Sequence, residues 1–296
     1  MSGLSEVDVS GTIWQRIPTI SLGISVKEGV RLPFAVKSSM EEAYRSEVGN
    51  ATVIGWNFSA TLPQHFDSTL YPFERLQIKI TLKQKNTQDK VQLVPDFSSY
   101  DVYAPSSNPF VAKDSFIPGW LIKQTYFTLL SGNHSTTFGY SNKVLTEYTK
   151  DLSLNITIQR KIMTNFLSTF LPIFMLSTIA YIALLITSGD EMKISIFAFK
   201  PSNMQAVAAS FLLFIVFSML NIRNQIISDN VLYVEYMYFF MYFVVFWLVV
   251  ASTKIAMKEE NSIFCYHDGH IVKTLYWPMV SGSMFLITAI VFLLNS

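Results

Sequence analysis

The chain has 296 residues, of which 50% are apolar and 15% are charged, and its mean hydropathy is +0.33. This composition excludes an ordinary soluble globular domain, because such domains carry about 25% charged residues. The formal net charge is +1, and no basic patch is interleaved with aromatic residues, so we expect no nucleic acid as a partner. Part of the chain is therefore expected to lie in a membrane.

Charged residues are unevenly distributed along the chain. Residues 1–160 carry 15 Lys/Arg and 14 Asp/Glu, whereas residues 161–296 carry seven of each. We therefore predict two domains, a β domain over 1–160 and a transmembrane domain over 161–296. The single cysteine, Cys265, excludes an intrachain disulfide. The first residues lack the basic and apolar regions of a signal peptide, so we expect that either a leader or other upstream sequence has been removed.

Short runs of alternating apolar and polar residues recur in the first domain and are typical of half-buried strands. Turn signals rich in Gly, Pro, Asn and Ser separate these runs, and only Ser38–Ser46 is a candidate for a helix. The pattern predicts an antiparallel β-sandwich. The predicted strands are Val7–Trp14, Thr19–Val26, Val53–Ala60, Gln77–Leu82, Gln92–Phe97, Tyr126–Leu130 and Leu152–Ile158.

Four charge-poor segments follow, and each is long enough to cross about 30 Å of hydrocarbon. An even number of crossings places the β domain and the C-terminus on the same side. The connections 187–200 and 254–273 contain five lysines, whereas the opposite loop 223–230 contains only Arg223, so the β domain is predicted to be extracellular or periplasmic. The predicted spans are about 162–186, 201–222, 231–253 and 274–296.

The tetrapeptide Tyr71-Pro72-Phe73-Glu74 is followed after two residues by Gln77 and a predicted strand. This segment resembles the hallmark loop of the pentameric ligand-gated ion channels, the Cys-loop receptor superfamily, in which an aromatic residue, Pro, Phe and Asp precede a Gln. Glu74 stands where Asp is usual. The flanking cysteines are missing, as in bacterial members of the family.

The order of features extends the resemblance over residues 53–296. Arg160 corresponds to the family's basic residue before the first helix, and Leu171-Pro172 corresponds to the proline within that helix. Fewer residues precede the loop than the family's sandwich normally has. The start of the second span, Lys200–Asn203, lacks the glutamate that marks cation selectivity in the family, so ion selectivity stays open.

The resemblance implies one subunit of a homopentameric ligand-gated channel, in which the second span lines the pore and the β domain gates it. The coupling residues would be Tyr71, Pro72, Phe73, Glu74 and Arg160. The implied partners are further copies of the chain, membrane lipid, a permeant ion and a small-molecule or ion ligand, and no cofactor is implied. The alternative is a non-conducting four-span sensor that signals through a partner. No catalytic motif is found, so we expect no enzyme.

Two rotational registers of the second span place different residues on a lumen. The first follows from alignment with bacterial channels. Rotating the helix by about a third of a turn from it would instead expose Asn203, Ser210 and Phe214, and the sequence leaves both registers open. The small residues of this span could also serve close helix packing. Alignment of the outer loop with bacterial channels gives a lumen lined by Gln205, Ala208, Leu212, Ile215, Met219 and Ile222.

Aromatic residues are frequent after the loop, and the family binds agonists between subunits among such rings. Four of them lie in or beside turn-rich segments and are the ligand-binding candidates, with core packing as the alternative for each. The run Cys265–His270 has the residue types of a zinc site but not the paired spacing, so no metal site is predicted. The ligand-binding candidates are Tyr100, Trp120, Tyr140 and Tyr148.

Overall fold

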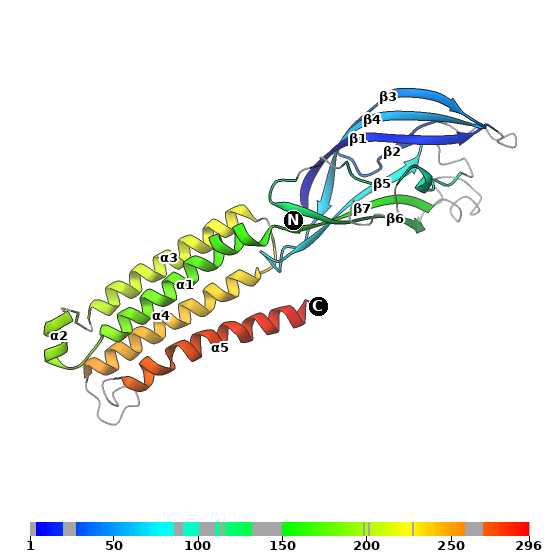
Figure 1. Cartoon of the computed structure of the whole chain (residues 1–296). Helices are drawn as coiled ribbons and strands as arrows, with labels where there is room; N and C mark the ends of the chain where they lie inside the picture. Colours follow the sequence, from blue (N-terminus) through cyan, green and yellow to red (C-terminus); the bar gives the residue numbers. More distant parts are fainter. Residues whose placement is uncertain are drawn as a thin grey trace, which may run out of the picture. The chain divides into compact units, whose positions relative to one another are not determined.

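The computed structural model divides the chain into two compact units. Met1–Phe66 and Arg75–Arg160 form the β unit, whereas Asp67–Glu74 and Lys161–Ser296 form the helical unit (Figure 1). The prediction of antiparallel sheets followed by four long apolar helices is confirmed. The described residues are 4–19, 28–85, 91–100, 110–112, 115, 117–131, 150–197, 199–200, 202–226, 228–257 and 269–295.

The described β unit contains two antiparallel sheets (Figure 1). The first has the order β1-β4-β3 and consists of β1 (Leu4–Pro18), β4 (Ala51–His65) and β3 (Lys37–Val48). The second has the order β2-β5-β7-β6 and consists of β2 (Val30–Arg31), β5 (Arg75–Gln84), β7 (Lys150–Arg160) and β6 (Trp120–Ser131). A 3-10 helix, η1 (Phe97–Ser99), lies between β5 and β6 in the sequence.

Apolar side chains from both sheets form one buried cluster in the β unit. Leu62 of β4 meets Ile78 and Ile80 of β5 and Ile158 of β7 there. The period of two in β5 explains this burial, because the alternate residues Leu76, Ile78 and Ile80 face the cluster while Arg75, Gln77 and Lys79 stay exposed. The antiparallel sheets are confirmed, and the face-to-face sandwich stays a prediction.

The side chain of Gln64 joins the two sheets. Its Nε2 donates to the carbonyl oxygen of Lys79 at 3.0 Å, and its Oε1 accepts from the backbone N–H of Lys79 at 3.2 Å. β7 pairs with one edge of β5 at Lys79, but on the opposite edge β2 pairs only with Lys83 and Gln84, so no described strand lies beside Lys79 there. The Gln64 amide therefore supplies the hydrogen bonds that a neighbouring strand would make.

Two expectations for the β unit are wrong. Ser38–Ser46 lies within β3, because its backbone pairs with β4 and this pairing overrides the helix-forming Glu, Met and Ala side chains. Gln92–Phe97 is not a strand, since it has no regular structure before η1, and the Asp96 carboxylate accepts the Ser98 and Ser99 hydroxyls in a local turn. Most of the expected strand Thr19–Val26 lies outside the described residues.

Four helices of the helical unit are long enough and apolar enough to cross a membrane, which supports a multi-pass membrane protein. Their ends lie within four residues of the predicted spans. A fifth, short helix in the connection after the first span was not expected. The helices are α1 (Ile162–Ile186), α2 (Glu191–Phe197), α3 (Asn203–Gln225), α4 (Tyr233–Met257) and α5 (His270–Leu294).

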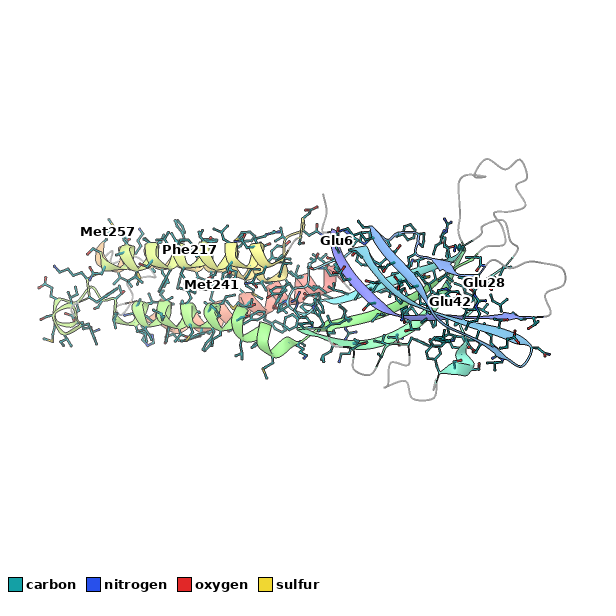
Figure 2. All side chains as sticks on the ribbon, turned by 90° about the horizontal axis from the view of Figure 1, so that it is seen from above. Glu6, Glu28, Glu42, Phe217, Met241 and Met257 are labelled. Atoms are coloured by element: carbon teal, nitrogen blue, oxygen red, sulfur yellow. The ribbon has the colours of Figure 1, made fainter. Side chains whose placement is uncertain are left out.

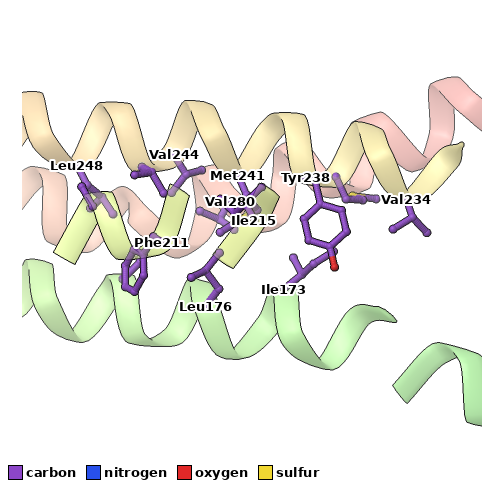
Figure 3. Close-up of a cluster of buried hydrophobic side chains, with 14 of the residues drawn as sticks. Ile173, Leu176, Phe211, Ile215, Val234, Tyr238, Met241, Val244, Leu248 and Val280 are labelled. Atoms are coloured by element: carbon purple, nitrogen blue, oxygen red, sulfur yellow. The ribbon is translucent and has the colours of Figure 1, made fainter. Parts of the chain in front are cut away.

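Helix α4 occupies the centre of the bundle and packs against α1, α3 and α5. Met241 and Val244 of α4 meet Leu176 of α1, Ile215 of α3 and Val280 of α5 in the core (Figure 3). Helix α4 begins at Tyr233 and ends at Met257, and α2 lies at the Met257 end of the bundle (Figures 1 and 2). The bundle therefore has one end where α4 begins and another that carries α2.

Candidate functional site

The loop between β4 and β5 belongs to the helical unit, although both strands belong to the β unit. Two overlapping turns shape this loop, since the N–H of Tyr71 donates to the Ser68 carbonyl at 2.9 Å and that of Phe73 donates to the Leu70 carbonyl at 2.7 Å. The peptide bond between Tyr71 and Pro72 is cis. We call residues 67–74 the docking loop.

Phe73 carries the docking loop into an aromatic cluster of the bundle. Its ring centroid lies 6.0 Å from those of Phe170 in α1, Tyr233 in α4 and Phe292 in α5. The backbone N–H of Tyr233 donates to the Thr69 carbonyl at 2.7 Å, so the loop satisfies an N–H at the start of α4 that has no partner within the helix. One side chain of the loop thus contacts three helices at once.

A buried ion pair lies at the same end of α4. Arg223 in the last turn of α3 makes two charge-assisted hydrogen bonds to the Glu235 carboxylate, one of them at 2.6 Å. The carboxylate also accepts the N–H of Leu232 at 2.8 Å, and Arg223 donates to the Ser228 carbonyl at 2.7 Å. Glu235 is fully buried. The ion pair therefore links the last turn of α3 to the first turn of α4.

The structure places the predicted coupling residues in two groups. Tyr71, Pro72 and Glu74 are buried and Phe73 is half-buried in the docking loop of the helical unit. Arg160 ends β7 in the β unit, where its guanidinium lies 4.3 Å from the centre of the Trp120 ring. Because Glu74 and Arg160 belong to different units, their pairing stays a prediction.

The predicted lumen residues do not share one environment. Ala208, Ile215 and Ile222 are buried in the bundle core, and Met219 is half-buried. Gln205 and Leu212 are exposed.

The residues of the alternative register share one environment, since Asn203, Ser210 and Phe214 are all exposed. Which of the two registers faces a lumen stays a prediction.

Two of the four ligand candidates are described, and both are occupied by neighbours. The Tyr100 ring lies 5.3 Å from Trp14 and 4.8 Å from Phe110, and burial raises its pKa to about 12. Trp120 presents one face to Arg160. Tyr140 and Tyr148 lie outside the described residues.

A carboxylate borders the aromatic cluster around Tyr100. The indole N–H of Trp14 donates to Asp96 at 3.3 Å. Hydrogen bonds from Ser98 and Ser99, with a smaller one from Trp14, hold the pKa of Asp96 below its usual value. The cluster therefore combines rings with a negative charge on the β unit.

Sequence reasoning missed the Arg223–Glu235 pair and the three rings around Phe73. A signal for the pair was present, because Arg223 is the only basic residue of the short outer loop and Glu235 is the only acidic residue of the third span. No group of three or more metal-ligating side chains occurs in the part of the chain that the structure describes. Residues 265–268 of the Cys/His run lie outside it.

Comparison of the chain with models of known protein families gives no match, and comparison with curated proteins gives none either. The functional conclusion therefore rests on the residues of this chain and their packing.

Proposed function

We propose that the chain is one subunit of a pentameric ligand-gated ion channel, in which α3 lines the pore and the β unit gates it from the extracellular or periplasmic side. The single observation that carries the proposal is the exposed side of α3. In this proposal the chain has no catalytic role, and the ligand is a small molecule or ion bound by the β unit.

The exposed side of α3 differs from that of α5. Both helices expose large apolar side chains, such as Phe285 and Leu293 of α5, and each exposes a serine, Ser281 of α5 and Ser210 of α3. The difference lies in the amide side chains, because α5 contains no Asn or Gln, whereas α3 exposes Asn203, Gln205 and Asn221. Polar side chains in a membrane face the bundle interior or a water-filled cavity, so the exposed side of α3 is suited to water and to neighbouring subunits rather than to lipid.

The middle of the same side carries bulky apolar residues. Leu213 is 60% exposed, Phe217 is 68% exposed and Leu220 is 53% exposed, and they follow one another at helical spacing. In a ring of subunits, such residues would form an apolar constriction that closes the pore by dewetting. One four-helix bundle encloses no lumen of its own, so several copies are required.

The docking loop supports gating. A segment between two strands of the β unit places Phe73 against three helices, and the N–H of Tyr233 bonds the same segment. A displacement of β4 or β5 would therefore pull on the end of the bundle where α4 begins.

The experiment combines oligomeric state with cysteine accessibility. In a Cys265→Ser background, cysteines at Ser210 and Phe214 should react with water-borne thiol reagents and block ligand-evoked current. The matched controls, Ala208→Cys and Ile215→Cys, should stay unreactive. A monomer or dimer of the full chain in detergent would refute the channel. A pentamer that carries no current under any ligand would favour the non-conducting sensor.

A further inference from the structure

Helix α2 buries none of its seven residues. Three of its apolar side chains are exposed to an unusual degree, Met192 at 73%, Ile196 at 70% and Phe197 at 55%. Its start is nevertheless well formed, because the Asp190 carboxylate accepts the N–H of Met192 at 3.1 Å and the Asp190 carbonyl accepts that of Ile194 at 3.0 Å. The helix is therefore capped but has no apolar packing partner within the described chain.

A helix of this length needs such a partner. Isolated helices shorter than about 12 residues are marginal in water, because nucleation costs more than a single turn of hydrogen bonds returns. The stability of α2 must therefore come from a surface that covers Met192, Ile196 and Phe197.

The position of α2 in the chain identifies that surface. Four residues separate α2 from the end of α1 at Ile186, so its first residue lies at most about 18 Å from that end. Five residues separate Phe197 from α3 at Asn203. Both neighbours have the length and composition of membrane spans. The connection is therefore held at the level where α1 and α3 leave the hydrocarbon.

The order of residues in α2 fits a membrane boundary. Met192 and Ile196 are four residues apart and share one side of the helix, while Glu191 and Ser195 share another. Lys200, which is exposed, follows in the same connection, and its long stem allows the ammonium group to reach the lipid phosphates.

We propose that α2 is an interfacial helix that lies in the boundary between lipid headgroups and acyl chains, with Met192, Ile196 and Phe197 inserted and Glu191 and Ser195 facing water. This inference rests on the membrane placement of α1 and α3 and not on channel activity. It therefore stands or falls separately from the proposed function.

The test compares two adjacent positions. Single cysteines replace Ile196 or Ser195 in the Cys265→Ser chain, are labelled with bimane, and the full chain is reconstituted into phosphatidylcholine and phosphatidylglycerol vesicles. Both positions are exposed, so neither substitution should disturb the bundle. Quenching by lipids with a shallow doxyl group should be at least about twofold stronger at position 196 than at 195, and quenching by iodide should show the reverse order.

Two results would overturn the proposal. Equal access of iodide to both positions in vesicles would mean that the apolar side of α2 faces water. Protection of position 196 from iodide without doxyl quenching would mean that protein covers it, either a second copy or another partner. Labels at Met192 and Glu191 form a second matched pair that repeats the comparison one turn away.

Discussion

Replacing Arg223 by glutamine should destabilise the helical unit by about 3 kcal/mol, at the lower end of the cost of breaking a buried ion pair. The Glu235 carboxylate has no exposed surface and would keep only the hydrogen bond from the Leu232 N–H, so a negative charge would remain in the bundle without its cation. The lower end applies because the Arg223 side chain is 32% exposed and water reaches part of it. Glu235→Gln should cost less, about 1–2 kcal/mol, because the neutral amide still accepts the Leu232 N–H.

A double-mutant cycle measures the pair itself. Unfolding of Arg223→Gln, Glu235→Gln and the double variant in detergent, followed by the loss of α-helical circular dichroism that reports the helical unit, should give a coupling energy of about 2 kcal/mol. The exposed pair of Arg45 and Glu42, whose atoms lie 2.9 Å apart, is the control; its cycle is measured on unfolding of the β unit and should show no measurable coupling because water screens the pair. A coupling below about 0.5 kcal/mol for Arg223 and Glu235 would refute the reasoning, since distant sites show as much.

Phe73→Ala should lower the stability of the helical unit by about 2 kcal/mol in the same circular-dichroism assay, while Phe73→Leu should lose less than half of that. Equal losses would show that the contact with three rings is not formed. Gly49 has φ +60° and open space where a Cβ would lie, so it should tolerate Asn better than Ala. Gly49→Ala should lower the free energy of unfolding of the β unit by about 1 kcal/mol in chemical unfolding. The pKa of Asp96 lies below its usual 3.8 in the fold. Wild type should therefore be more stable than Asp96→Asn above that pH, and this advantage should be lost as the pH falls further. A stability difference that does not depend on pH would contradict this.

The long elements could be predicted from the sequence because few alternatives exist for them. A segment of more than 20 residues without a charge predicts a membrane span, because a small soluble domain rarely contains one. Alternation of apolar and polar residues with a period of two predicts a half-buried strand, as in β5. Ser38–Ser46 misled the interpretation because its composition favours a helix, whereas pairing with β4 decides its structure. Helix α2 was missed because seven residues are too few to show a helical period.

The functional residues were predictable only in part. The docking loop could be found because its order of Tyr, Pro, Phe and Glu is distinctive. The side of α3 that faces the core could not be found, since 211–217 is an unbroken apolar run and every rotation of the helix presents apolar residues. Only packing against α4 distinguishes Ile215 from Phe217. The pairing of Arg223 with Glu235 likewise depends on how the connection between α3 and α4 folds back.

The docking loop also sets an order of events during synthesis. Phe73 is synthesised before any of the rings that receive it, because these belong to α1, α4 and α5, and Phe292 follows Phe73 by 219 residues in the sequence. β4 and β5 belong to different sheets, and each can pair with its own partner strands while Phe73 is still exposed to water. A nascent chain arrested before α5 should therefore leave this ring accessible to chaperones until α5 has been synthesised.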